Sequence, residues 1–185
     1  MALSLVRFDS ECEELRRNVL RLHIIANSDS DEDQQLKLAV RDAVLRTADG
    51  FFEKNMTLRE AEKTVEDHLP QLQAAANNVI AGNGKKYAAD ITLEDSFFET
   101  REYEDFTLPA GTYRSVMVRL GKAKGKNWWC VVFPAICIPA AAPEARLTDA
   151  VSKDAARVAD NPDRYQMRFK IVEIWQDFKK FLRDQ

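Results

Sequence analysis

Apolar positions in the first half of the chain follow helical spacing, apart from one short apolar run. Residues 12–22 predict a short helix that leads into a strand at residues 22–26. Two longer helical patterns follow, at residues 30–50 and 57–82, and each begins with Ser or Thr three residues before an acidic residue. This spacing is typical of a helix N-terminus, and Pro70 is expected to bend the second helix. The first half therefore predicts one strand and two long helices.

The apolar period changes to two after residue 84. Apolar and polar residues alternate over residues 87–93, and three further strand patterns follow at residues 97–106, 113–120 and 127–133. The segments between these patterns are short, and short connections favour antiparallel pairing. The second half therefore predicts a mainly antiparallel sheet of about four strands.

The chain closes on the pattern of an amphipathic helix with a large aromatic face. Its apolar positions are Ile171, Ile174, Trp175, Phe178, Phe181 and Leu182. Helices first, then strands and then a helix predict an α+β fold. A length of 185 residues fits one domain, which we place at residues 21–185, with residues 1–20 as a lead-in helix or an expression remnant.

Composition excludes several classes of protein. The chain has 27 basic and 30 acidic residues, so its net charge of −3 provides no overall attraction for nucleic acid or an anionic membrane. Its longest apolar run, residues 128–143, is broken by prolines and is too short to span a membrane. The opening residues contain no apolar stretch of the kind that signal peptides need, so we expect a cytosolic protein or the mature part of an exported one.

Three aspartates suggest a metal site that the surrounding residues do not complete. Asp29, Asp31 and Asp33 alternate like the first ligands of a calcium loop. The sixth and twelfth positions of such a loop are here Gln34 and Val40 instead of Gly and Glu. Acidic residues in the first turn of a helix are explained more simply by attraction to the helix dipole, so we expect no metal.

Catalytic pairs are equally incomplete. His23 and Cys130 are the candidate base and nucleophile, but Cys130 lies in an apolar strand where a cysteine is usually inert. The glycine- and lysine-rich residues 121–126 precede a strand instead of a helix, so we interpret them as a solvated hairpin turn and not as a phosphate loop. We therefore predict neither an enzyme nor a cofactor. The alternative is a small hydrolase or ligand-binding domain built around His23 and the strand segment Trp128, Trp129 and Cys130.

Two features of the last strand leave alternatives open. Trp128 and Trp129 are adjacent and must point to opposite faces of a sheet. Either helices cover both faces, which we favour, or one tryptophan belongs to an exposed docking patch. Cys130 and Cys137 can form a disulfide only if the chain turns back between them, for which Pro134 marks a place, and both stay reduced in a cytosolic protein.

Several stretches resemble one known family. They are RLHIIANSDSDEDQ at residues 21–34 with RDAVL at 41–45, LPAGTY at 108–113, NWWCVVFPAIC at 127–137 and FKIVEIW at 169–175. These segments resemble stage II sporulation protein R over nearly the whole chain from Arg21 onward. Two departures are the missing export segment and an alanine, Ala135, where the family usually has a second proline.

The resemblance implies a signalling protein that is not an enzyme. Such proteins are made in the forespore of an endospore-forming bacterium and exported into the space between forespore and mother cell. There they activate a membrane-bound aspartic protease, which processes the pro-form of the early mother-cell sigma factor. The implied partner is that protease, with no nucleic acid and only peripheral contact with membrane. On the oxidising side of the membrane, Cys130 and Cys137 are expected to form a disulfide, and Cys12 is expected to stay free.

Our predicted partner surface lies around the end of the first strand. The segment at residues 23–29 contains more polar side chains than a turn that only caps a helix needs. Hydrogen bonding within the turn explains Asn27 equally well. The residues predicted to bind the partner are His23, Asn27, Asp29, Arg41, Asp42, Trp128 and Trp129.

Overall fold

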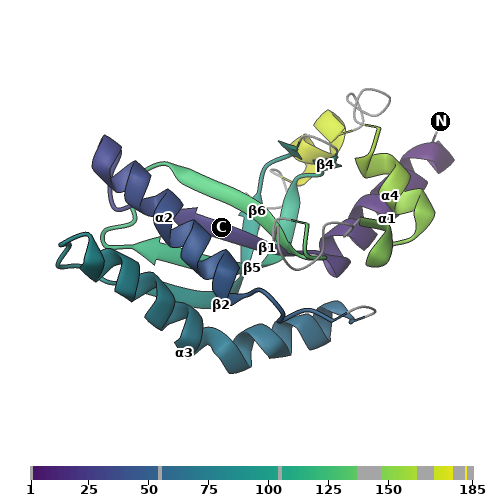
Figure 1. The fold of residues 1–185 in the computed structure, drawn as a ribbon. Coiled ribbons are helices and arrows are strands. Elements are labelled where there is room, and N and C mark those ends of the chain that lie inside the picture. The colour runs from purple at the N-terminus through teal and green to yellow at the C-terminus, as the bar shows by residue number, and fades with distance from the viewer. Residues whose placement is uncertain are drawn as a thin grey trace.

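A computed structural model describes residues 2–53, 56–103, 106–136, 147–161, 169–176 and 182. Its elements are α1 (Ala2–Asn18), β1 (Leu20–Ile25), α2 (Asp31–Thr47), α3 (Leu58–Gly82), β2 (Ala89–Phe98), β3 (Arg101–Glu102), β4 (Thr107–Leu108), β5 (Gly111–Leu120), β6 (Asn127–Phe133), a 3-10 turn (Leu147–Asp149) and α4 (Lys153–Ala159). Residues 169–176 are also helical. Helices α2 and α3 lie across one face of the sheet, while α1 and α4 lie together at its far end (Figure 1). The predicted α+β fold is confirmed.

The two long helices begin where their sequences predict. The Ser30 side chain accepts a hydrogen bond from the Asp33 backbone N–H, and Thr57 and Glu60 form a reciprocal capping box. Each cap satisfies backbone donors that would otherwise lack partners in the first turn. Pro70 lies inside α3. The apolar sides of both helices pack against one face of the sheet, with Leu22, Ile24, Val40, Val65, Val116, Val118 and Cys130 in the shared core.

The N-terminal helix is longer than residues 12–22 predict. Helix α1 buries Phe8, Cys12 and Leu15, and the strand begins at Leu20, earlier than expected. Leu15 belongs to a second apolar core at the end of the sheet, together with Val19, Phe98, Tyr113, Val131 and Ala155. The N-terminal segment therefore covers part of the sheet face that α2 and α3 leave open.

The order of the sheet differs from the order of the chain. The strands lie in the order β2-β5-β1-β6, with β1 parallel to β5 and the other neighbours antiparallel. The predicted hairpin between β5 and β6 is therefore wrong, because β1 lies between them. The predicted strand at residues 97–106 is also wrong, since β2 extends to Phe98 and β3 and β4 form a separate two-stranded ribbon.

Residues 121–126 are largely exposed to solvent, as expected, but they cross over the end of β1 instead of making a hairpin turn. Gly125 N–H donates to the Ala26 carbonyl at 2.9 Å, and Ala26 N–H donates to the Lys126 carbonyl at 3.5 Å. A Cβ at Gly125 would overlap the Ser28 carbonyl, so only glycine fits this close approach. The crossing loop therefore continues the backbone pairing of β1 past its last residue.

Asp33 joins three parts of the fold at this same end of the sheet. Its carboxylate accepts hydrogen bonds from the Asn27 side-chain amide and the Tyr87 hydroxyl, both at 2.8 Å, and from the Ser28 hydroxyl. The hydrogen bond from Ser28, together with those from Asn27 and Tyr87, holds the pKa of Asp33 at about 2, below its usual value. Asp33 is buried, and it ties the end of β1 and the start of α2 to the residues that precede β2.

Candidate functional site

The sheet face opposite α2 and α3 carries polar and aromatic side chains. The strand registers place His23, Thr92, Glu94, Ser96, Arg119 and Trp129 on this face, and all six are half-buried. We call these six residues the open sheet face. The expectation that helices cover both faces fully is therefore wrong at this end of the sheet, although Trp128 and Trp129 do point to opposite faces.

Trp129 is the centre of an aromatic and cationic stack. The His23 ring lies beside it, with ring centroids 5.5 Å apart and planes inclined by 26°. The guanidinium carbon of Arg101 lies 3.6 Å from the Trp129 ring centroid, a close cation–π contact. Three residues that are distant in the sequence thus form one half-buried cluster, which we call the Trp129 stack.

His23 contributes shape and hydrogen bonding to the stack. Its Nε2 lies 3.0 Å from Asn127 Oδ1, and its Nδ1 is buried without a hydrogen-bond partner among the described residues. Burial lowers the pKa of His23, which favours the neutral ring. Because β1 pairs His23 with Trp129, the next residue, Cys130, points to the opposite face of the sheet. The structure therefore separates the two groups on which the hydrolase alternative depends.

An ion pair extends the open sheet face toward β2. Arg119 donates to Glu94 Oε1 at 2.6 Å and to the Thr92 hydroxyl at 3.1 Å. The hydrogen bond that Glu94 accepts from Arg119 lowers the pKa of Glu94, so its carboxylate is charged at neutral pH. The face thus presents both signs of charge next to an aromatic cluster.

A fully buried arginine, Arg21, lies on the same sheet face as the stack and packs against Phe98, whose ring also contacts His23. The guanidinium carbon of Arg21 lies 4.0 Å from the Phe98 ring centroid and 4.9 Å from that of Tyr113. One Arg21 nitrogen donates to the Tyr103 hydroxyl at 2.6 Å, while Nε and Nη1 have no hydrogen-bond partner among the described residues. Aromatic rings therefore supply much of the environment that a carboxylate usually provides. Tyr103 directly follows β3, so this contact holds the strand that carries Arg101.

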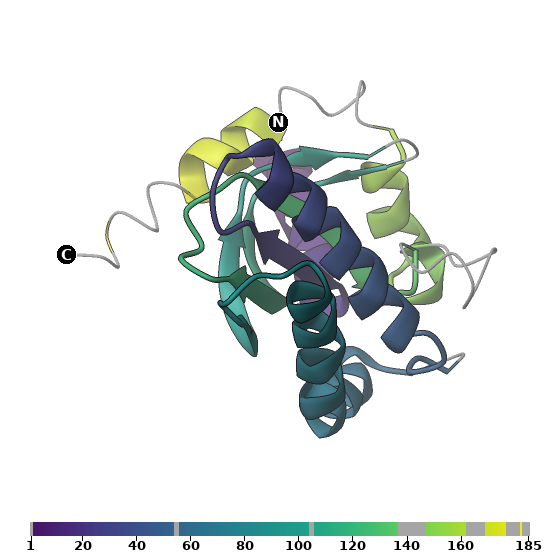
Figure 2. The ribbon, with the colours of Figure 1, turned by 60° about the vertical axis from the view of Figure 1, so that its left-hand side comes forward.

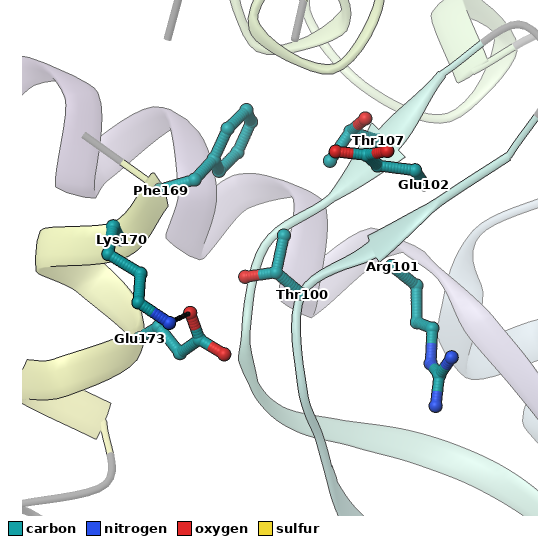
Figure 3. Close-up of a pocket in the computed structure, with 7 residues that line it drawn as sticks. All are labelled: Thr100, Arg101, Glu102, Thr107, Phe169, Lys170 and Glu173. Carbon is teal, nitrogen blue, oxygen red and sulfur yellow. Dashed lines mark hydrogen bonds and ion pairs between the residues drawn. The ribbon is translucent and has the colours of Figure 1, made fainter. Parts of the chain in front are cut away.

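A cavity of roughly 370 Å³ adjoins the stack through Arg101. It lies between the β3–β4 ribbon and the helix at residues 169–176, as Figure 3 shows. Phe169, Lys170 and Glu173 line the helix side, and the Lys170 ammonium pairs with the Glu173 carboxylate at 2.8 Å. The ribbon side is lined by Thr100, Arg101, Glu102 and Thr107. Arg101 is the residue that the cavity and the stack share.

Three of the predicted partner residues lie on the other side of the sheet. The guanidinium carbon of Arg41 is 5.2 Å from the Trp128 ring centroid, and Arg41 also pairs with Asp42 at 2.7 Å. Trp128 packs against the core beneath α2 and α3. The sheet itself thus separates Arg41, Asp42 and Trp128 from His23 and Trp129.

Asn27 and Asp29 hold the crossing loop. Asn27 Oδ1 accepts from Lys122 N–H at 2.9 Å, and Asp29 Oδ1 accepts from Lys126 N–H at 2.6 Å. These hydrogen bonds within the chain explain why both side chains are polar, and no contact with a partner protein is needed. The seven predicted residues therefore occupy three separate places: His23 with Trp129, Arg41 with Asp42 and Trp128, and Asn27 with Asp29 at the crossing loop.

Sequence reasoning missed Arg21, Glu94, Arg101 and Arg119. Arg21 carried a usable signal, since it is a charged residue at the start of an apolar strand. The sequence around Arg101 contained no such signal, because the contact of Arg101 with Trp129 depends on where the β3–β4 ribbon lies in the fold.

The acidic residues beside Ser30 are arranged for capping and local hydrogen bonding. Asp31 and Glu32 lie in the first turn of α2, and the Asp33 carboxylate already accepts three hydrogen bonds. Within the described part of the chain, no three His, Cys, Asp or Glu side chains come close enough to hold a metal ion.

The cysteines lie in different environments. Cys12 is a buried free thiol, and burial raises its pKa to about 12. Cys130 is buried on the α2 and α3 side of the sheet. Cys137 lies outside the described residues, so its disulfide with Cys130 stays a prediction.

Comparison with known proteins identifies relatives. The family model described as stage II sporulation protein R matches residues 16–142. Stage II sporulation protein R of Bacillus subtilis (strain 168) is 36% identical over 118 residues, which are 64% of this chain and 53% of that relative. The chain thus spans about half of the relative's length. No solved structure matches it. The family match ends before the C-terminal helix, which the resemblance had included.

Proposed function

Because the chain belongs to the stage II sporulation protein R family, we propose that it is an exported signal that activates a membrane-bound aspartic protease of the mother cell. A role in sporulation follows from the family itself. In the proposal, the protein acts from the space between forespore and mother cell by binding the protease. The activated protease then processes the pro-form of the early mother-cell sigma factor.

The Trp129 stack is the observation that supports a binding role most directly. Tryptophan and arginine are the residue types that most often dominate binding energy at protein interfaces. Here Trp129 and Arg101 are both half-buried, so they are held in place and still offer surface to a partner. Glu94 and Arg119 beside them supply charges that can fix the orientation of that partner.

Reconstitution tests the proposed activation. Purified protease in vesicles is mixed with pro-sigma factor, with and without this protein, and cleavage is followed on gels. We expect cleavage only when all three are present, with a rate that saturates as this protein is added. Cleavage at the same rate without this protein, or none with it, would contradict the proposal. Replacing the protease with a variant that lacks its catalytic aspartate controls for contaminating proteases.

Export predicts a specific thiol count. If Cys130 and Cys137 are joined, protein from its native compartment should show one free thiol per chain when denatured without reductant, that of Cys12. The same protein should show almost none while folded, because the Cys12 thiol is buried and its pKa is raised to about 12. Thiol titration with a coloured disulfide reagent measures both counts. Three free thiols in the denatured protein would contradict the disulfide.

A further inference from the structure

Among the half-buried arginines in the described part of the chain, Arg101 alone forms no ion pair. The others, Arg41, Arg114 and Arg119, each pair with at least one carboxylate. The guanidinium carbon of Arg101 instead lies 3.6 Å from the Trp129 ring centroid. The positive charge of Arg101 is therefore held in place, but no described carboxylate neutralises it.

The β3–β4 ribbon directs the Arg101 side chain away from acidic residues that lie near it in the sequence and in the fold. Arg101 and Glu102 are neighbours in β3, so their side chains point to opposite sides of the ribbon. Figure 3 shows this difference, and it shows that Arg101 points away from Glu173 as well. Glu94, the acidic member of the open sheet face, is already paired with Arg119 at 2.6 Å. Among the described residues, no carboxylate is therefore placed to neutralise Arg101.

Contact with Trp129 prepares Arg101 to bind a carboxylate. A guanidinium that lies on an aromatic ring keeps the N–H groups at its edge free, and these donors match the two oxygens of a carboxylate. The His23 ring also packs against Trp129, with ring centroids 5.5 Å apart, and this contact restricts the indole. Because the arginine is held before a partner arrives, less conformational entropy is lost on binding.

We infer that Arg101 binds a carboxylate on an acidic side chain of the partner protein. This inference rests on the proposed function, in which the partner is a membrane-bound protease. A phosphate group fits the same donors, but phosphate sites are usually built from clusters of arginines or from rows of backbone N–H groups. Here a single arginine without an ion pair lies beside a sheet face that also carries Glu94, and this arrangement suits the single charge of a carboxylate.

Charge exchange across the interface tests the inference. The protease is reconstituted in phosphatidylcholine vesicles, and binding is measured by sedimenting the vesicles with increasing amounts of this protein. Arg101→Glu should weaken binding about tenfold or more, because the partner's carboxylate then meets a negative charge. Each acidic residue of the protease outside its membrane-spanning segments is then replaced singly by arginine. One of these replacements should strengthen the binding of Arg101→Glu about tenfold and weaken that of the wild type.

Arg59→Glu is the matched control for the charge exchange. Arg59 is exposed on α3, which lies on the opposite side of the molecule from the β3–β4 ribbon (Figure 2). This variant should bind like the wild type, and all three proteins should melt at similar temperatures, which excludes unfolding as the cause of a loss. Wild-type affinity in Arg101→Glu, equal losses in both variants, or a loss in Arg101→Glu that no replacement in the protease restores overturns the inference.

Vesicles without protease test whether the anion is a lipid phosphate instead. No helix in the part of the chain that the structure describes is long and apolar enough to cross a membrane. Binding to vesicles that contain phosphatidylglycerol, abolished by Arg101→Glu, would overturn the inference. Cleavage of pro-sigma factor, followed in the same samples, reports the proposed function separately. Restored binding without cleavage would contradict activation but support the carboxylate contact, whereas a wild type that does not bind the protease at all would contradict both.

Discussion

Arg101→Glu is expected to reduce protease activation about tenfold or more while the melting temperature stays within a few degrees of wild type. Arg101 lies with its guanidinium carbon 3.6 Å from the Trp129 ring centroid and also lines the adjoining cavity. The substitution removes the cation from the stack and places a negative charge beside Glu102. Since Arg101 is only half-buried, the fold should tolerate the change. The reconstituted cleavage assay measures the effect as the concentration of protein that gives half-maximal activation.

Arg59→Glu is the control for that result. Arg59 is exposed in the first turn of α3, a helix that covers the opposite face of the sheet. A glutamate there is favoured by the helix dipole, so neither stability nor activation should fall. Equal activation by Arg101→Glu and wild type would remove the Trp129 stack from the proposed interface. Equal losses in both variants would point to overall charge instead.

Asp33→Ala is expected to lower the free energy of unfolding by about 3 kcal/mol, because three partly buried hydrogen bonds to a carboxylate lose their acceptor. The donors that lose this acceptor are the side chains of Asn27, Ser28 and Tyr87, and of these the Ser28 hydroxyl can still donate to Ser30 Oγ. These groups hold the end of β1 beside α2 and the lead into β2, so the loss affects the centre of the fold. Urea unfolding at neutral pH, followed by circular dichroism, measures the change.

Asp31→Ala provides the matched control for Asp33. Asp31 lies in the same helical turn and is exposed, so its removal should cost less than about 1 kcal/mol through the helix dipole alone. Equal effects of the two substitutions would show that the side-chain hydrogen bonds of Asp33 contribute little to stability.

Protonation of Asp33 at low pH should destabilise the wild-type protein in the same way as Asp33→Ala. The pKa of Asp33 is about 2 in the folded state and near 3.8 when unperturbed. A lowered folded-state pKa means that the carboxylate stabilises the protein fully above pH 3.8 and that this stabilisation is lost as the pH falls toward 2. The difference in unfolding free energy between wild type and Asp33→Ala should therefore shrink across this window. A constant difference from pH 5 to pH 2 would contradict it.

Asn27 shows why stability and activity must be measured together. We predicted Asn27 as a partner residue, but its side chain donates to Asp33 and accepts from Lys122 N–H. Its substitution by Ala should therefore weaken the crossing loop whether or not the partner contacts it. His23 is a better probe, because its ring contacts Trp129 and Phe98 and its Nε2 meets Asn127, so none of these contacts holds the crossing loop to Asp33.

Local features of the sequence were sufficient to predict α2, α3 and β6. The caps at Ser30 and Thr57 predicted where α2 and α3 begin, and the pattern at residues 127–133 predicted β6 with its bounds. The side-chain alternation of a strand placed Trp128 and Trp129 on opposite faces. Each of these features depends on residues only a few positions apart, so the order of the strands in the sheet does not affect them.

Only the tertiary structure decided the sheet order and the candidate surface. A connection as short as residues 121–126 suits a hairpin, yet here it crosses the end of β1, and insertion of that strand depends on pairing with residues about 90 positions away. The Arg21 contact with Tyr103, 82 residues apart, and the Arg101 contact with Trp129 follow from the same arrangement. Such contacts join two distant segments, and the apolar and polar pattern of each segment predicts its own helix or strand without reference to the other segment. The pattern within either segment therefore contains no information about which partner it meets, and the energy of the assembled fold decides it.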